Sequence, residues 1–347
     1  MKKSMVSIVA YAVLAFADPV LDYQLAGQDT YNQGNYEIAI EDYKRALEIQ
    51  VMTLSPMDPN LARSYNNLAV LYEKIGDNIK ALEYHLKCLP IVEKMLGLEH
   101  PDIAKRYNNI GSLYRTTGDY PKALEYFKKS VFVQEKVLGL QHPDTANSYN
   151  DIGSIYYNLE NHLEALKYFQ KSLAIREKVL GLQHPDTASS YNNMGALYHS
   201  MGDYSKAIEF YLKALAVSEK ASGHDSLDTA HSYNNIGSLY DEMGNYPKAL
   251  EYFQKSLTIK EKVLGLNHPS TATSYNNIGG LYYHTGDYPK ALEYFQKSLA
   301  IKETVLGSGH PETINNYINV REVYKRMGND DKALEYHNKS IAVIVEQ

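Results

Sequence analysis

Apolar residues recur at helical spacing through most of the chain. Tyr275, Ile278 and Tyr282 stand at i, i+3 and i+7, which places them on one face of a helix. A second stripe of the same spacing runs over residues 291–299. Gly286 separates the two stripes, and glycine ends a helix well because it accepts a left-handed backbone. The pattern predicts two helices joined by a tight turn.

The polar residues between the stripes strengthen this prediction. Asp287 is suited to cap the second helix, and Pro289 falls in its first turn, where a missing N–H costs little. In the segment "VLGSGHPET", Gly307 then provides a stop and Pro311 a new start. A helical hairpin of this size cannot bury its own apolar face, so we expect it to stack on neighbours.

Such neighbours are present, because the pattern repeats with a constant step of 42 residues. The step is marked by Tyr65, Tyr107, Tyr149, Tyr191, Tyr233, Tyr275 and Tyr317, and one more step back reaches Tyr23. The turn glycines keep the same phase, except that Glu160 stands where the others have glycine. A fixed period of this length is the signature of a solenoid.

We therefore predict an all-α solenoid of eight helix-turn-helix units. The predicted units are 20–61, 62–103, 104–145, 146–187, 188–229, 230–271, 272–313 and 314–347. Small residues should mark the place where paired helices touch, namely Gly111, Gly153, Gly195, Gly237 and Gly279. The last unit has Arg321 at this place, and a more polar terminal unit is typical of a capping repeat.

The residues just described resemble the tetratricopeptide repeat. The linker "EKVLGLQHPDTA" and the 42-residue step are similar to the kinesin light chain subclass, although no heptad coiled coil precedes the repeats. The resemblance implies a right-handed superhelix whose first helices line a concave groove for an extended peptide or a partner helix. Two departures, Glu160 and the Ser226-Leu227 pair in place of His-Pro, are expected to bend or loosen the array.

The resemblance also implies which positions line the groove: two before each repeat tyrosine, the two that follow it, and those five, eight and nine after it. The candidates are Arg63, Asn66, Asn67, Lys74, Lys105, Asn108, Asn109, Arg115, Asn150, Tyr157, Asn192, Asn193, His199, Asn234, Asn235, Asp241, Asn276, Asn277 and Tyr283. A ladder of asparagine amides offers donors and acceptors to an extended peptide backbone. The alternative is that these asparagines bridge neighbouring repeats.

The charge of the predicted groove changes along the chain. Arg63, Lys74, Lys105 and Arg115 make its early part basic, which favours a partner segment with acidic residues. Ordinary solvated surface charge is the alternative interpretation. The net charge of −6 and the lack of a basic groove throughout argue against nucleic acid as a partner.

Signatures of catalysis are missing from the sequence. The single cysteine, Cys88, excludes an internal disulfide and a multi-cysteine zinc site, and it falls at a small packing position. The linker histidines 100, 142, 184, 268 and 310 occur once per unit, so they cannot converge on one metal and are expected to start the next helix. The other hypothesis for histidine chemistry is a pH-sensitive or metal-binding contact between His199 and His231. We expect no cofactor, no small-molecule substrate and no enzymatic activity.

The first residues, "MKKSMVSIVAYAVLAFADPV", have the layout of a secretory signal peptide, with two lysines, an apolar run and a small-x-small site ending at Ala17. The run is short for a membrane span. We expect residues 1–17 to be removed, residues 18–347 to form the array, and the protein to be periplasmic or secreted. A cytoplasmic protein with an apolar first helix is the alternative.

These observations favour a non-catalytic scaffold that binds a protein or peptide in its groove. Two alternatives stay open. One is a self-assembling structural or envelope scaffold that uses its convex face or its ends, with Ile341, Val343 and Ile344 docking on another copy. The other is a regulatory or sensor subunit of an enzyme complex.

Overall fold

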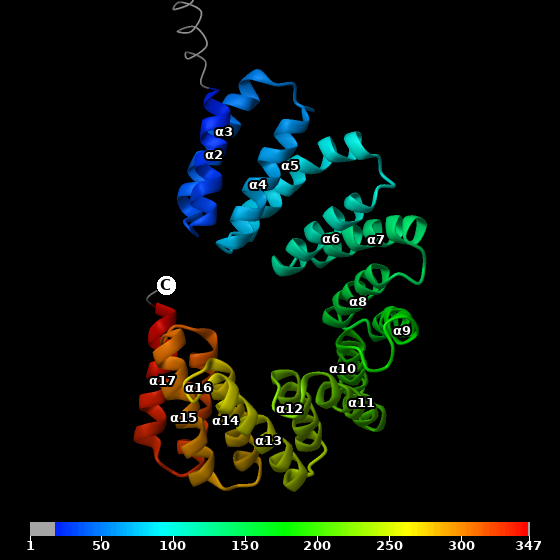
Figure 1. The fold of residues 1–347 in the computed structure, drawn as a ribbon. Helices are drawn as coiled ribbons and strands as arrows, with labels where there is room; N and C mark the ends of the chain where they lie inside the picture. The colour runs from blue at the N-terminus through cyan, green and yellow to red at the C-terminus, as the bar shows by residue number, and fades with distance from the viewer. Residues whose placement is uncertain (1–17, 346–347) are drawn as a thin grey trace, which may run out of the picture. The chain divides into compact units, whose positions relative to one another are not determined.

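The computed structural model describes residues 18–345, with side chains as far as residue 341, and contains sixteen α-helices and no strand in that span (Figure 1). The helices are α2 Pro19–Asn32, α3 Tyr36–Thr53, α4 Pro59–Lys74, α5 Asn78–Leu96, α6 Pro101–Thr116, α7 Tyr120–Val137, α8 Pro143–Asn158, α9 His162–Val179, α10 Pro185–Ser200, α11 Tyr204–Ser222, α12 Leu227–Glu242, α13 Tyr246–Leu264, α14 Pro269–His284, α15 Tyr288–Leu306, α16 Pro311–Arg326 and α17 Asp330–Val345. The all-α prediction is confirmed for this span.

None of these helices is long and apolar enough to cross a membrane. The predicted signal peptide lies outside the described residues.

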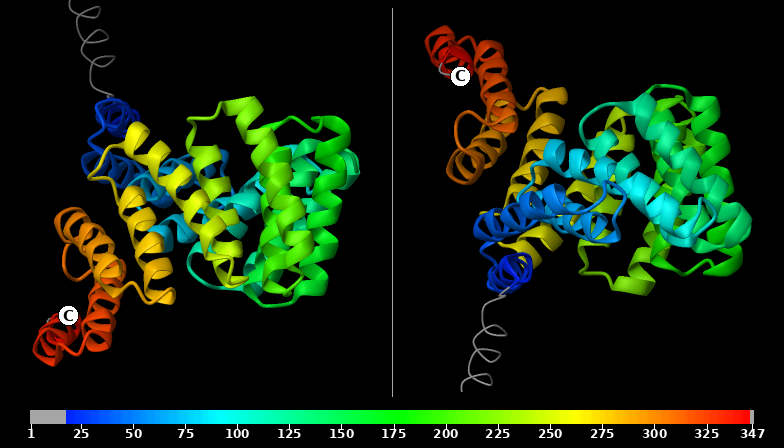
Figure 2. Two further views of the ribbon diagram at one scale, coloured as in Figure 1. Left: turned by 90° about the horizontal axis from the view of Figure 1, so that it is seen from below. Right: turned by 90° about the horizontal axis from the view of Figure 1, so that it is seen from above.

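The chain divides into two compact units between Tyr168 and Phe169. In each unit the helices pack as consecutive hairpins (Figures 1 and 2). In the first unit, α4 packs on α5 and α6 on α7, and the second helix of one hairpin contacts the first helix of the next. In the second unit, α10 to α17 follow the same rule.

The core of each interface combines the two predicted apolar stripes. In the second unit, Ala249, Phe253 and Leu257 of α13 form one buried cluster with Tyr275, Ile278 and Leu281 of α14. The apolar stripe of one hairpin thus packs against the next hairpin, as the sequence predicted.

Capping residues start the first helix of most hairpins. The Nδ1 atom of each linker histidine accepts a hydrogen bond from the backbone N–H two residues later, at 3.1–3.2 Å, in His100, His142, His184, His268 and His310. The predicted role of these histidines in starting helices is confirmed. Ser226 replaces the histidine before α12, and its Oγ accepts from the N–H of Thr229 at 3.2 Å. The Ser226-Leu227 departure therefore changes the capping group and keeps the start of the helix.

Glu160 adopts the left-handed conformation of the glycine that it replaces. Its φ is 56°, and it is the one residue other than glycine with a positive φ in the described part of the chain. The equivalent turn glycines, Gly118 and Gly202, have φ of 83° and 74°. The turn between α8 and α9 is therefore kept at the expense of backbone strain.

The predicted contact glycines allow the two helices of a hairpin to approach. A Cβ atom added to Gly237 would lie 2.7 Å from the ring of Phe253, and one added to Gly279 would lie 2.8 Å from the ring of Phe295. Gly111 and Gly195 show the same close approach to an aromatic ring. The prediction that these glycines mark the helix contact is confirmed for Gly111, Gly195, Gly237 and Gly279.

Candidate functional site on the first helices

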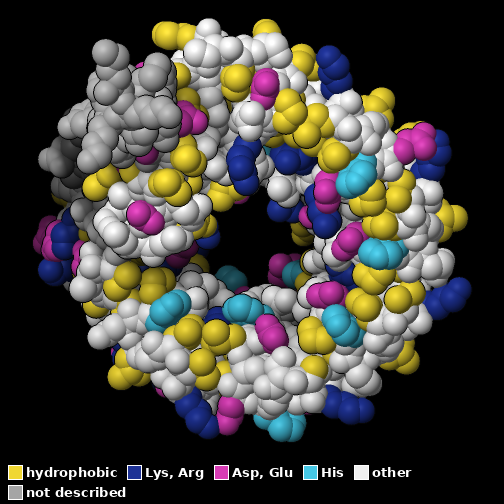
Figure 3. Space-filling model, turned by 45° about the horizontal axis from the view of Figure 1, so that its top comes forward, with side chains coloured by type: hydrophobic (Ala, Val, Ile, Leu, Met, Phe, Trp, Pro, Cys, Tyr) yellow, Lys and Arg dark blue, Asp and Glu magenta, His cyan; other side chains and the backbone are white. Residues whose placement is uncertain are grey.

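The predicted groove residues lie on the first helices of the hairpins, α4, α6 and α8 in the first unit and α10, α12 and α14 in the second. All of them are exposed or half-buried. We call the solvent-facing side chains of these helices and of α16 the first-helix surface. Charged and histidine side chains lie interspersed on the face drawn in Figure 3, without a large area of one sign.

Several asparagines of the first-helix surface bridge neighbouring repeats. The bridges are Arg106 Nη1 to Asn66 Oδ1 at 3.1 Å, Asn108 Nδ2 to Ser148 Oγ at 2.8 Å, Asn277 Nδ2 to Asn234 Oδ1 at 2.8 Å, and Asn319 Nδ2 to Asn276 Oδ1 at 2.9 Å. Each joins the first asparagine of a pair to the next first helix. These contacts support the structural alternative for the first asparagines, while binding by the pairs stays a prediction.

Asn192 differs from the other first asparagines. Its Oδ1 atom is buried and has no hydrogen-bond partner in the described part of the chain. It lines a hollow of about 220 Å³ between α10, α11 and α12. A second hollow, of about 210 Å³, contains Asn66 and Asn67 together with Gln28 and Tyr31. The first hollow therefore contains one asparagine and the second contains two.

Charged positions late in the first helices also pair across repeats. The pairs are Arg115 with Asp151 at 3.2 Å, His199 Nε2 with Glu242 at 2.7 Å, His284 Nδ1 with Asp241 at 3.0 Å, and Arg326 Nε with the Tyr283 hydroxyl at 3.1 Å. The partner of His199 is thus Glu242, while His231 lies at the hollow beside Asn192. No group of three potential metal ligands occurs among the described residues.

The basic character predicted for the early repeats is reduced by these pairs. Asp151 accompanies Arg115, and Asp102 lies 3.9 Å from the Lys105 ammonium group. Arg63 and Lys74 are exposed. Exposed pairs of this kind contribute about 0–1 kcal/mol to stability, so the basic side chains can exchange partners easily.

Cys88 is a packing residue, as its phase predicted. It is fully buried, and its Sγ donates to the Ala62 carbonyl oxygen at 3.2 Å. Ser130, one period later, makes the same contact to Ala104 at 2.8 Å. Burial raises the pKa of the Cys88 thiol, so the reactive thiolate is disfavoured.

Sequence reasoning missed a hydrogen bond that joins consecutive hairpins from α5 to α16. The repeat tyrosine of a first helix donates to a glutamate on the second helix before it. Bonds of 2.5–2.7 Å join Tyr107–Glu93, Tyr191–Glu177, Tyr233–Glu219, Tyr275–Glu261 and Tyr317–Glu303, and Tyr149 donates to Glu135 in the same way. The signal was available, because a glutamate stands fourteen residues before each repeat tyrosine from Tyr107 to Tyr317, while Val51 takes this place before Tyr65. Burial, and then this hydrogen bond, raise the pKa of these tyrosines.

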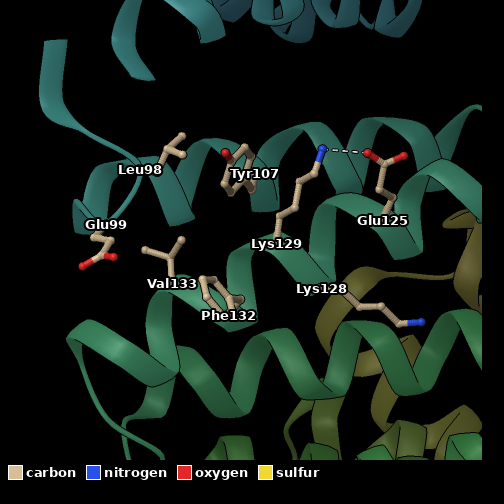
Figure 4. A pocket seen from close by; sticks show the side chains of 8 residues that line it. All are labelled: Leu98, Glu99, Tyr107, Glu125, Lys128, Lys129, Phe132 and Val133. Atoms are coloured by element: carbon tan, nitrogen blue, oxygen red, sulfur yellow. Dashed lines mark hydrogen bonds and ion pairs between the residues drawn. The ribbon is translucent and has the colours of Figure 1, made fainter. Parts of the chain in front are cut away.

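A larger hollow, of about 570 Å³, lies away from the asparagines (Figure 4). Side chains of α6, α7 and the linker before α6 line it, with Phe132 and Val133 on α7 beneath Tyr107. Phe132 is 66% exposed. The sequence signal was that Phe132 stands in phase with smaller residues, Ala174, Ala216, Thr258 and Ala300.

Comparisons with known proteins agree with this architecture. The model of the tetratricopeptide repeat family matches residues 21–94, 74–136, 102–178, 144–220, 186–262, 228–304 and 270–344. No curated protein matches the chain.

Solved structures show the same fold at low identity. The quorum sensor NprR from B. thuringiensis is 14% identical, with a TM-score of 0.68 over 99% of this chain and 93% of that one. A tetratricopeptide repeat protein from Parabacteroides merdae is 18% identical, with a TM-score of 0.62 over 90% of this chain and 100% of that one. Kinesin light chain-type repeats from Podosopora anserina are 23% identical, with a TM-score of 0.51 over 60% and 99%. From the periodic sequence, the stacked hairpins and the family match, we conclude that the chain belongs to the tetratricopeptide repeat family, whose members are generally non-catalytic scaffolds for protein–protein interaction.

Proposed function

We propose that the protein is a non-catalytic scaffold that binds an extended peptide segment of a partner on its first-helix surface. The observation that carries the proposal is a pair of hollows beside the first helices, one in each compact unit: Asn66 and Asn67 help to line the hollow of the first unit, and Asn192 that of the second. Amide groups at such hollows can bind an extended backbone that passes over them, whose N–H and C=O groups need partners once they leave water.

The charge of the surface supports a partner segment that is acidic at one end. Arg63, Lys74 and Lys105 are exposed on the first unit. An acidic segment lying over them would replace weak, solvated pairs such as Lys105–Asp102 with contacts that are partly shielded from water.

A signalling role is a second candidate, suggested by the fold that the chain shares with the quorum sensor NprR. At 14% identity this similarity concerns the fold alone. In this case the bound segment would be a signal, and the scaffold would pass its presence to a partner.

A displayed library of random peptides, selected on the full chain, tests the proposal. The enriched peptides would then be measured against Asn67→Ala and Asn192→Ala, which change the two hollows. The matched control is Gln254→Ala, an exposed change on the second helix α13. We expect binding to fall about tenfold in at least one asparagine variant, a loss of about 1.4 kcal/mol, and to be unchanged in the control.

Thermal melts would show that the three variants are folded. Equal binding by all variants, or enrichment of no peptide on the natural chain, would overturn the proposal.

A further inference from the structure

A long basic or polar side chain fills the same place in most repeat interfaces of the second unit. Arg176, Lys260 and Lys302 stand in phase near the end of a second helix, and only 6%, 4% and 5% of each is exposed. Each reaches the start of the next first helix. Arg176 donates to Ser190 Oγ at 2.7 Å, and Lys260 donates to Ser274 Oγ at 3.0 Å.

Lys302 shows the full arrangement. Its ammonium group contacts Asn316 Oδ1 at 3.4 Å and the Glu312 carboxylate at 3.1 Å. A nearly buried ammonium group is stable in a protein only when hydrogen-bond acceptors and a counter-charge accompany it. The repeat interface therefore has a built-in place for an amine.

Ser218 occupies this place in the interface between α11 and α12. Serine is too short to reach the next helix, and the hollow of about 220 Å³ lies beside it, lined also by Asn192, Asp228 and His231. This volume is below the roughly 300–1,000 Å³ of typical small-molecule sites and suits a single side chain.

Two acceptors of the interface have no partner in the described part of the chain. Ser232 is in phase with Ser190 and Ser274, which accept from Arg176 and Lys260; it is fully buried, and its Oγ makes no hydrogen bond there. The buried Oδ1 of Asn192 is the second such acceptor. Leaving a buried polar atom unpaired is unfavourable, so a donor that enters the hollow and reaches Asn192 would recover this energy.

The charge of the lining also fits an amine. Asp228 stands in phase with Glu312, the counter-ion of Lys302, and its Oδ2 accepts a hydrogen bond from Ser222 at 3.0 Å. Partial removal from water at the hollow, and then the neighbouring Lys260, lower the pKa of His231, so this ring is neutral near pH 7 although part of it stays exposed. Asp228 is then the charged group of the lining.

We propose that the hollow between α10, α11 and α12 binds a lysine side chain of the partner segment, whose ammonium group takes the place that Lys302 fills in its own interface. Ser189 and His231 are exposed at the rim, so a segment on the first-helix surface can insert a side chain there. Lysine matches better than arginine because a compact ammonium with three donors suits the two acceptors of the lining, Asn192 and Asp228. This proposal rests on the proposed function for the partner but makes a separate claim about the hollow.

The first test uses the full chain and the variant Ser218→Lys, which supplies the amine internally. The control is Ser205→Lys, an exposed change on the same helix. Peptides enriched on the natural chain and on the control should share a lysine at one position. Peptides enriched on Ser218→Lys should lack that preference. No lysine preference on the natural chain, or the same preference on Ser218→Lys, would overturn the proposal.

The second test stands even if no peptide is enriched. Nα-acetyl-lysine N-methylamide is titrated into the labelled full chain and followed by NMR, with the norleucine and arginine analogues as comparisons. We expect shifts at Asn192, Asp228 and His231 that saturate with the lysine probe and are absent in Ser218→Lys. The absence of shifts, or equal shifts with the norleucine analogue, would overturn the proposal that the hollow binds an amine. Equal shifts with the arginine analogue would overturn the preference for lysine over arginine.

Asp228→Asn provides a variant that does not depend on fitting a longer side chain. It should weaken binding of the lysine probe about fivefold, because a charge-assisted hydrogen bond becomes a neutral one. Unchanged binding in a folded Asp228→Asn chain would contradict the role of this carboxylate.

Discussion

At the scale of single residues, one backbone conformation decides whether the two helices of a repeat can turn back on each other. Glycine provides it in most turns, while Glu160 provides it between α8 and α9 with a φ of 56°. A side chain in this conformation is strained by about 1–2 kcal/mol because its Cβ approaches the following carbonyl oxygen.

Replacing Glu160 by glycine should therefore stabilise the protein. We expect Glu160→Gly to raise the free energy of unfolding by about 1 kcal/mol, since the relief of strain exceeds the added freedom of the unfolded chain. Urea denaturation measures the difference. The reverse change, Gly286→Ala, should lower stability by about 1 kcal/mol. An unchanged midpoint in both variants would contradict this account of the turn.

The tyrosine hydroxyl is a second single-residue feature with a measurable effect. Tyr275 donates to Glu261 at 2.5 Å across a repeat interface. Tyr275→Phe should cost about 1–2 kcal/mol, because the carboxylate loses a partly buried donor. Tyr282, which stacks on Tyr294, is the matched control, and its change to phenylalanine should have a smaller effect in the same denaturation experiment.

The raised pKa of these tyrosines gives the protein a defined response to alkali. A pKa that is higher in the folded state than in the unfolded state stabilises the fold fully below the unfolded value of about 10. The contribution is lost as the pH rises above that value. We expect unfolding free energy to fall steeply above about pH 10 and to fall less in Tyr275→Phe, which denaturation at several pH values would measure. Identical curves for the two proteins would contradict the coupling.

At the scale of helices, two adjacent glycines of α14 have opposite roles. Gly279 faces the ring of Phe295, while a Cβ on Gly280 would have no atom within 4 Å. Position 279 therefore sets how closely α14 and α15 approach, and position 280 is open.

Alanine should therefore act in opposite directions at these two neighbours. Gly279→Ala should lower the unfolding free energy by about 1–3 kcal/mol through overpacking. Gly280→Ala should raise it by up to about 1 kcal/mol through better helix propensity. Thermal or chemical denaturation compares the two variants directly, and the same sign of effect at both positions would argue against the proposed contact.

The helices also show what sequence could and could not predict. Helix starts, turns and contact glycines were predictable because capping, left-handed backbone and close approach depend on nearby residues such as His268 and Gly279. The residues to which the asparagines bridge were not predictable. Asn108 bridges to a residue 40 positions later, while Asn234 bridges to one 43 positions later. This difference depends on how neighbouring helices are offset, which a periodic sequence leaves undetermined.

The hollow at Ser218 was missed for a different reason. The departure from Arg176, Lys260 and Lys302 is visible in the sequence once the period is known. The resulting hollow could not be predicted from the sequence, because α10, α11 and α12 together define the space that the short side chain leaves. The exposure of the predicted groove residues, by contrast, could be predicted from the position of each residue in the repeat.

At the scale of the whole molecule, a repeat contacts its neighbours in the chain, so damage should stay local. Gly279→Ala should increase hydrogen exchange in α14, α15 and the adjoining hairpins and leave the amides of α4 to α7 unchanged. Hydrogen exchange with mass spectrometry would map the change. A uniform increase over both compact units would mean that the array unfolds as one cooperative body.

The hydrogen bond between a repeat tyrosine and the glutamate fourteen residues before it has a consequence for how the protein is made. Tyr317 and Glu303 are fourteen residues apart, so the bond forms as soon as a short loop closes, and such a loop costs little entropy. A nascent chain that has released one hairpin and the next first helix already holds every residue of that interface. The array can therefore fold in order behind the ribosome, each hairpin docking on the one before it, without waiting for the C-terminus.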